Sequence, residues 1–268
     1  MKNRTIIGVL VSAFLVTGAV LAHAYEVGEV HNGGTIHGQV TFSGPPPAPL
    51  RFIVEKNPEI CGQERSLQKV ETHNGLLAGA VVVLEDVKKG KPFPTQAFSG
   101  SLPGEGEFRY QGGNALGLQV KTKGCNFGPF TGVIAADEAV QFENLDSIKH
   151  ILHTFAAKDR KGTILRTVHN QDILPQATIA RSFDADKLRE SHMVRLTCNR
   201  HDFMQNWLYV VDHPYFAISD QDGHFTINQI PSGTYTLLAW HPILGEQRQE
   251  IQVTARGELK PTIPFARD

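Results

Sequence analysis

The sequence predicts an all-β protein, and three observations support this. Short runs of β-branched and aromatic residues recur along the chain, Gly- and Pro-rich turn signals separate them, and no long amphipathic helix interrupts them. Many short, punctuated strands are typical of a sandwich or barrel. We expect strands at 35–42, 80–85, 133–134, 139–142, 151–155, 192–197 and 207–211, turns at 43–47, 89–90, 103–104 and 112–113, and one or two helical turns at 184–190.

The N-terminal part and the tail of the chain have different strand patterns. The segment 35–42 alternates apolar and polar residues, whereas 80–85 is a continuous β-branched run that indicates a buried strand. In the tail, 215–227 is typical of two strands joined by a tight Asp-Gly turn, 230–240 of a further turn and strand, and 249–254 of a last alternating strand.

The first residues are typical of a secretory signal. Lys2 and Arg4 precede an apolar run at 6–22, and Ala22-His23-Ala24 fits a small-residue cleavage site. We therefore predict a signal peptide at 1–24 and a soluble periplasmic or secreted protein, with an uncleaved membrane anchor as the alternative. No later segment is apolar for long enough to cross a bilayer, so no membrane span is expected after cleavage.

Charge and length exclude one class of partner and little else. The formal net charge is −1, and removal of Lys2 and Arg4 leaves 24 basic and 27 acidic residues, a net charge of −3. This balance argues against nucleic acid as a partner, because nucleic acid binding needs a basic face. The remaining length allows one or two domains.

A group of metal-binding residue types lies at 198–204. Cys198, His201 and Met204 follow one another at spacings of three, between strands expected at 193–197 and 207–211. Sulfur and imidazole donors suit copper, and two His with one Cys and a weak axial Met form a type-1 copper site for electron transfer. The alternative is a buried cysteine, a surface histidine and a methionine of the core.

The second histidine of such a site must come from upstream. His150 lies where a strand ending near Asn144 connects to the strand at 151–155. His153 is the rival, but residues three apart on a strand point to opposite faces, so we prefer His150. Asn144 or Asp146 is expected to support the loop beside it. The predicted ligands of one copper ion are His150, Cys198, His201 and Met204.

The chain has three cysteines, at 61, 125 and 198. If Cys198 binds the metal, Cys61 and Cys125 are left to form a disulfide, which an exported protein favours. The alternative is two free thiols.

These motifs resemble the cupredoxins. Phe142-x-Asn144-x-Asp146-x3-His150 with Cys198-x2-His201-x2-Met204 is similar to the plastocyanin/amicyanin-like exported proteins labelled methylamine-utilisation proteins. Further similar features are Gly34 to Val40, Cys61-Gly62, Gly124 to Phe127, His213 to Ala217 and Ala239 to His241. The resemblance implies a Greek-key β-sandwich whose exposed end presents His201 as the exit for electrons.

The tail resembles a second, smaller module. The segment 212–265 is similar to the carboxypeptidase regulatory-like, transthyretin-like β-sandwich, and 34–42 with 78–84 resembles its first half. This predicts a nested arrangement, in which the copper domain is inserted into the small sandwich. The expected divisions are 1–24 for the signal peptide, 33–90 for the N-terminal segment, 91–211 for the copper domain and 212–265 for the tail.

Two residues depart from the family pattern. Ile151 stands where relatives often carry Asn, and Asp202 where they often carry Pro. The change to Ile151 puts in doubt a hydrogen bond beside the metal, and Asp202 is expected to add a carboxylate near the metal.

The leading functional hypothesis is an exported mononuclear copper protein that transfers electrons to or from a redox partner such as a cytochrome or an oxidoreductase. Copper storage or delivery, and a β-sandwich binding module without metal, are the alternatives. We expect no enzymatic activity, because the sequence has no further cluster of paired histidines for a second, open metal site.

Overall fold

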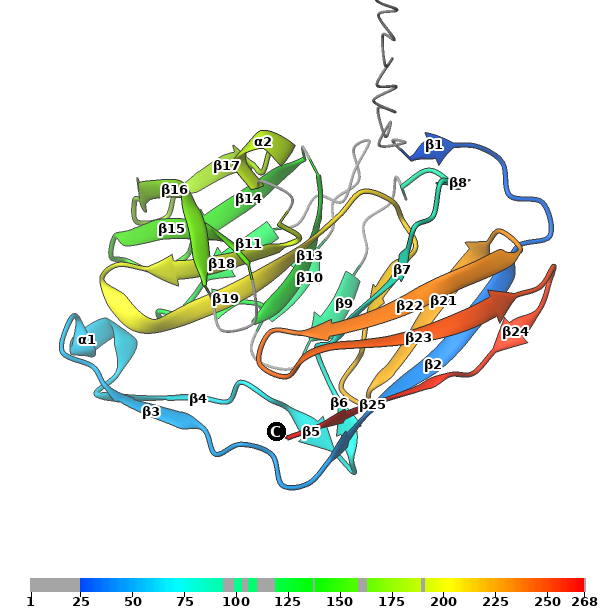
Figure 1. The fold of residues 1–268 in the computed structure, drawn as a ribbon. Helices are drawn as coiled ribbons and strands as arrows, with labels where there is room; N and C mark the ends of the chain where they lie inside the picture. Colours follow the sequence, from blue (N-terminus) through cyan, green and yellow to red (C-terminus); the bar gives the residue numbers. More distant parts are fainter. Residues whose placement is uncertain are drawn as a thin grey trace, which may run out of the picture.

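The protein is built almost entirely of β-strands, as the sequence predicts (Figure 1). The computed structural model describes residues 25–93, 99–102, 106–109, 119–136, 138–158, 163–188 and 191–267. The predicted signal peptide at 1–24 and the turns expected at 103–104 and 112–113 lie outside these residues. In the described part the helices are α1 (Pro58–Cys61) and α2 (Ala185–Leu188), each one turn long.

Two sheets form a sandwich from the middle of the chain, called here the central sandwich. One sheet has the order β12-β11-β14-β17 and the other β13-β19-β18-β15-β16. The strands are β11 (Gln119–Thr122), β12 (Phe127–Gly128), β13 (Thr131–Ala135), β14 (Ala139–Asn144), β15 (His150–Ala157), β16 (Ile164–Ile173), β17 (Thr178–Ser182), β18 (Met193–Cys198) and β19 (His201–Val211).

Two further sheets form the terminal sandwich, which combines both ends of the described chain. Its sheets have the orders β21-β2-β6-β5, with β24 and β25 also on β2, and β20-β7-β22-β23. The strands are β2 (Gly34–Ser43), β5 (Thr72–His73), β6 (Leu76–Leu77), β7 (Val81–Glu85), β20 (Phe216–Ile218), β21 (His224–Ile230), β22 (Gly233–His241), β23 (Gly245–Val253), β24 (Glu258–Leu259) and β25 (Thr262–Ala266). The remaining pairs are β1 (Glu26–Val27) with β8 (Lys89–Gly90), β3 (Leu50–Ile53) with β4 (Glu64–Leu67), and β9 (Ser99–Leu102) with β10 (Gly106–Arg109).

The terminal sandwich has the strand pairing that a nested arrangement requires. β2 pairs antiparallel with β21 and parallel with β25, and β7 lies between β20 and β22. Strands that precede the central sandwich in sequence therefore share sheets with strands that follow it, as Figure 1 shows in blue, orange and red. The residue limits proposed for the divisions at 33–90, 91–211 and 212–265 stay predictions.

Strand β7 is buried on both faces, which explains its continuous apolar sequence. Val82 and Leu84 belong to the core of the terminal sandwich, whereas Val81 and Val83 pack in the cluster of the central sandwich. Successive side chains of a strand point to opposite faces of its sheet, so a strand covered on both faces shows no apolar–polar alternation. The sheet that contains β7 therefore joins the two cores.

Aromatic side chains fill this junction. Trp240 of β22 meets Trp207 and Tyr209 of β19, with ring centroids 6.4 and 5.2 Å apart. All three rings are buried. Large rings in tilted contact contribute both buried area and favourable pair geometry, and they fix β19 against the terminal sandwich.

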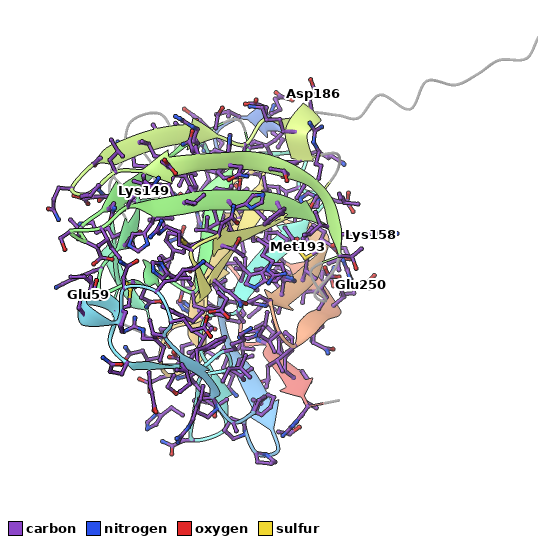
Figure 2. All side chains as sticks on the ribbon, turned by 90° about the vertical axis from the view of Figure 1, so that its left-hand side faces the viewer. Glu59, Lys149, Lys158, Asp186, Met193 and Glu250 are labelled. Carbon is purple, nitrogen blue, oxygen red and sulfur yellow. A yellow bond between two sulfur atoms is a disulfide. The ribbon has the colours of Figure 1, made fainter. Side chains whose placement is uncertain are left out.

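A connecting segment links the two sandwiches near the start of β19, away from the aromatic junction at Trp207 and Tyr209. Residues 50–67, called here the cap, comprise β3, α1 and β4 and run from β2 across to the central sandwich (Figure 1). Phe52 contacts Phe203 at 6.1 Å between ring centroids, and Cys61 is bonded to Cys125. Figure 2 shows Glu59 of the cap on the same side of the molecule as Lys149, which precedes β15. The cap belongs in sequence to the predicted N-terminal segment, yet it covers the central sandwich.

In the described part of the chain, no helix has the length and apolar character needed to span a membrane.

Candidate metal centre

The hairpin of β18 and β19 brings Cys198 and His201 together. These residues pair across the hairpin, while the next pair is Thr197 with Gln205, so residues 202–204 form a bulge in β19. The sequence suggested a loop that ends before Trp207, and this is wrong, because β19 already begins at His201. A bulge changes the direction of side chains while pairing continues, which allows His201 to lie beside Cys198.

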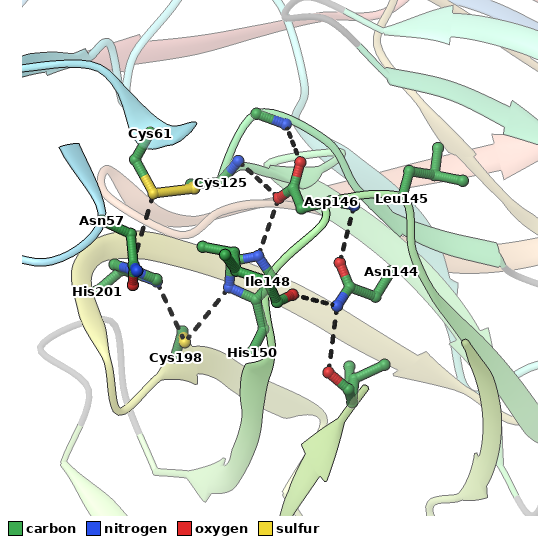
Figure 3. A network of polar contacts seen from close by, with 12 residues as sticks. Asn57, Cys61, Cys125, Asn144, Leu145, Asp146, Ile148, His150, Cys198 and His201 are labelled. Atoms are coloured by element: carbon green, nitrogen blue, oxygen red, sulfur yellow. Dashed lines mark hydrogen bonds and ion pairs between the residues drawn. A yellow bond between two sulfur atoms is a disulfide. The ribbon is translucent and has the colours of Figure 1, made fainter. Parts of the chain in front are cut away.

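His150 reaches the same place from the neighbouring strand. It begins β15, where Leu152 pairs with Cys198 of β18, and burial alternates along β15 with His150 and Leu152 on the buried face. The Nδ1 atom of His150 lies 3.9 Å from the Sγ atom of Cys198, and Nδ1 of His201 lies 3.8 Å from it (Figure 3). The exposed fractions of His150, Cys198 and His201 are 0, 3 and 2%.

His153 lies on the other face of β15, away from this cluster. Its Nδ1 atom is 2.7 Å from Oδ1 of Asn199, and its Nε2 atom is 3.3 Å from Oγ1 of Thr167. The two-residue period of a strand gives positions 150 and 153 opposite faces. The structure thus groups His150, and not His153, with Cys198 and His201.

Met204 is fully buried in the bulge of β19 and belongs to the same apolar cluster as Cys198. Asp202, in the same bulge, is exposed. The expectation that Asp202 adds a carboxylate near the metal is therefore wrong, because the bulge turns that side chain to solvent. The carboxylate beside the cluster is that of Asp146.

Asp146 connects His150 to a tight backbone turn. Its Oδ2 atom lies 2.9 Å from Nε2 of His150, and its two oxygens accept hydrogen bonds from the N–H groups of Gly124 (2.6 Å) and Cys125 (2.8 Å). Gly124 and Cys125 both have φ of +57°. Successive N–H groups in such a turn point to one side and form a concavity that binds anions.

Asn144 holds the loop rather than the histidine. Its Nδ2 group donates to the carbonyl oxygens of Ile148, Ile173 and Leu174 at 2.8, 3.1 and 3.0 Å, and its Oδ1 atom accepts from the N–H of Asp146 at 3.0 Å. Of the two residues predicted to support the site, Asp146 contacts His150 and Asn144 supports Asp146 (Figure 3).

Main-chain donors stabilise the thiolate of Cys198. The N–H of Ile151 lies 3.4 Å from Sγ, and the backbone of Arg200 donates to it as well. The bond from residue 151 needs no Asn side chain, so Ile151 keeps it. Burial raises the pKa of the Cys198 thiol, but the hydrogen bonds from His150, Ile151 and Arg200 outweigh burial and lower it below its ordinary value.

The pKa values of the two histidines are shifted in opposite directions. Burial lowers the pKa of His150, but its bonds to Asp146 and Cys198 outweigh burial and raise it above the ordinary value. Asp146 has a lowered pKa, since its bonds to His150, Cys125 and Gly124 outweigh burial. Burial, together with the charges of His150 and Arg200, lowers the pKa of His201 to about 4. Without metal, these contacts therefore favour the charged forms of His150, Asp146 and Cys198, whereas His201 is neutral at pH 7.

The cap covers His201, which corrects the expectation of an exposed histidine at the end of the sandwich. His201 is 2% exposed, its ring is hydrogen-bonded to the backbone of Lys56, and its Nε2 atom lies 3.7 Å from Sγ of Cys61. The predicted disulfide between Cys61 and Cys125 is present and forms part of this cover. Sequence reasoning missed the contact, because nothing in the spacing of residues 61 and 201 signals it.

These donors fit a soft metal ion. Sγ of Cys198 and one nitrogen from each of His150 and His201 lie within 4.8 Å of one another. The other ring nitrogens face Asp146 and the cap, so both Nδ1 atoms are turned toward the sulfur. Outer contacts of this kind fix the orientation of ligating imidazoles, and a thiolate with two imidazoles favours copper or zinc over magnesium or calcium.

Comparisons with known proteins give limited additional information. The family described as polysaccharide lyase family 4, domain II, matches residues 191–260, which run from β18 into the terminal sandwich. Similar solved structures include a purple cupredoxin from Nitrosopumilus maritimus (17% identity, 35% of this chain and 98% of that chain), a reduced single-residue mutant of amicyanin (13%, 48% and 98%) and amicyanin from Paracoccus versutus (13%, 45% and 96%). Each has a TM-score of 0.28. A search of curated protein sequences finds no match. The description of the site therefore rests on its own contacts.

Proposed function

We propose that this protein is an exported mononuclear type-1 copper protein that transfers electrons and catalyses no reaction itself. The observation that carries the proposal is the convergence of Nδ1 of His150 and Nδ1 of His201 on Sγ of Cys198 in a buried cluster. Met204 would be the weak fourth ligand. Copper, when bound, would supply a one-electron exchange between Cu(II) and Cu(I).

The chain's own contribution is to hold the donors in place before the ion binds. His150, Cys198 and His201 stand on three adjacent strands of one sheet, and Asp146 and the backbone of Lys56 orient the two rings. Ligands that are fixed by strands and outer hydrogen bonds change little between oxidation states. This rigidity favours electron transfer over copper storage or delivery, because delivery needs an accessible ion and these residues are buried.

A redox partner protein, such as a cytochrome or an oxidoreductase, would dock near the loop that precedes β15. Leu145 and Leu174 are 38 and 58% exposed there, beside the hydrogen bonds that Asn144 makes to the loop. Exposed apolar side chains next to a redox site suit a short-lived protein contact. The predicted signal peptide and the disulfide support a periplasmic or secreted location, since disulfides persist in oxidising compartments.

The proposal is tested by Cu(II) titration of the mature protein with visible absorption and electron paramagnetic resonance. We expect an intense thiolate-to-copper band that disappears reversibly on reduction, is absent in Cys198→Ser and His150→Ala, and persists in His153→Ala. A colourless protein that binds Cu(I) would favour storage or delivery. Loss of the band in His153→Ala would contradict the ligand assignment.

A further inference from the structure

A second cluster of metal-binding atoms lies on the other side of the His201 ring. Sγ of Cys61, Sγ of Cys125 and a ring nitrogen of His201 lie within 4.8 Å of one another, and all three residues are buried. The contact to Cys61 is made by Nε2, at 3.7 Å, whereas Nδ1 faces Cys198. The two clusters thus use different nitrogens of one histidine (Figure 3).

In the oxidised protein the two sulfurs are bonded to each other and are not available as thiolates. We propose that reduction of this disulfide creates a second soft-metal site, for Cu(I), formed by Cys61, Cys125 and Nε2 of His201. The proposal goes beyond electron transfer at Cys198, because it concerns other sulfurs and the other ring nitrogen. Two thiolates and an imidazole are a soft donor set that suits Cu(I) as well as zinc, and the reducing conditions that open the disulfide also keep copper as Cu(I).

The redox step balances with a dithiol as the reductant. One dithiol gives two electrons and two protons to the bond between Cys61 and Cys125, and it leaves as a disulfide while two thiols form. Binding of Cu(I) then releases the thiol protons to solvent, because the thiolate is the metal ligand. The His201 ring releases its hydrogen bond to the backbone of Lys56 and binds the metal through Nε2, in the tautomer that carries its proton on Nδ1.

Non-covalent contacts hold Cys125 in place without the disulfide. The N–H of Cys125 donates to Asp146, and Arg65 of the cap donates to the carbonyl of Gly124 at 2.6 Å. The carboxylate of Asp146 is itself within 4.8 Å of Cys125 and His150 donor atoms. The turn that carries Cys125 is therefore anchored from both sides.

Cys61 is held in a similar way. Its N–H donates to the carbonyl of Asn57, the N-cap residue of α1, and the cap packs through Phe52 on Phe203 and through the pairing of β3 with β4. Arg65 also lies over the Phe203 ring, 5.7 Å from its centroid. After reduction, both thiols therefore stay close to His201 in a buried, folded environment.

The experiment uses the mature chain with Cys198→Ser, which removes the thiolate of the first site. The disulfide is reduced with a phosphine, which is oxidised to the phosphine oxide with an oxygen atom from water while the two cysteines become thiols. The free thiols are then counted by their reaction with a chromogenic disulfide. Cu(I) is then titrated against a chromophoric chelator. We expect one Cu(I) per reduced protein, none in the oxidised form, and none in a matched Cys198→Ser, Cys61→Ser, Cys125→Ser variant.

Uptake by the reduced protein that does not exceed that of the triple variant would overturn the proposal. Near-ultraviolet circular dichroism verifies that the reduced protein is folded. The affinity is measured again in urea, where we expect it to fall by about 10-fold or more, because the contacts that orient the ligands are lost. Equal affinity in urea would also overturn the proposal, since two cysteines would then bind without the site. The oxidised wild-type protein, titrated in parallel, reports on the first site alone.

Discussion

Removal of the Asp146 carboxylate tests how the site is held together. In the structure Asp146 is 6% exposed and accepts hydrogen bonds from Gly124 N–H, Cys125 N–H and Nε2 of His150. Its lowered pKa indicates that it is ionised in the folded protein at neutral pH. The substitution Asp146→Ala leaves these donors without their acceptor, and one of them is on the His150 ring, whose charged form Asp146 favours.

The expected loss follows from the number of donors. A backbone donor left without its acceptor costs about 1–3 kcal/mol when it is buried, and breaking a buried charge pair costs about 3–5 kcal/mol. These terms overlap, so we expect Asp146→Ala to lower the free energy of unfolding of the metal-free protein by about 3–6 kcal/mol. Asp146→Asn keeps one acceptor oxygen and loses the charge, and we expect about half of this effect.

The assay is urea unfolding of the metal-free, disulfide-bonded protein at pH 7, followed by circular dichroism. The matched control is Asp172→Asn, which breaks an exposed ion pair with Lys149 at 2.9 Å. Such surface pairs contribute at most about 1 kcal/mol. A change for Asp146→Ala as small as that of the control would refute the reasoning that this carboxylate supports the site.

Three further predictions concern the rest of the fold. Reduction of the disulfide between Cys61 and Cys125 should lower the free energy of unfolding by about 2–5 kcal/mol, measured with urea in the presence and absence of a phosphine; three accessible thiols in the native protein would contradict it. Burial lowers the pKa of His241 to about 3. Between about pH 6.5 and pH 3 the ring is therefore protonated in the unfolded state only, so the free energy of unfolding should fall by about 1.4 kcal/mol for each pH unit toward pH 3. Urea titrations that give the same slope for His241→Gln would reject this. A Cβ atom at Gly38 would lie 2.2 Å from the Phe225 ring, so Gly38→Ala should cost about 1–3 kcal/mol in thermal or urea unfolding, and a neutral effect would show that β2 and β21 do not pack as described.

The fold class was accessible from the sequence because it depends on local patterns, whereas the nested pairing was expected from the resemblance of the two ends of the chain to one small module. The alternation at 35–42 and the turn signals of the tail determine which faces of the strands are buried. The joining of the two cores through β7 was not accessible. A continuous apolar run such as 80–85 indicates burial, but it does not tell which elements cover the two faces.

The site was accessible in part. The spacing of Cys198 and His201 and the opposite faces of His150 and His153 follow from strand geometry, which the sequence pattern contains. The cap over His201 does not follow, because it depends on a contact between residues 61 and 201 that lie far apart in the chain. The expectation that His201 is exposed came from the resemblance alone. The cap at 50–67 covers this histidine, so the expectation is wrong.

The central claim is that Cys198, His150 and His201 bind one copper ion. The most direct test is X-ray absorption spectroscopy of the copper-loaded, disulfide-bonded protein in both oxidation states. We predict a copper shell with one thiolate sulfur and two imidazole nitrogens that changes little on reduction, and loss of the sulfur in Cys198→Ser. A shell of nitrogen and oxygen atoms only, or one that is unchanged in Cys198→Ser, would contradict the account.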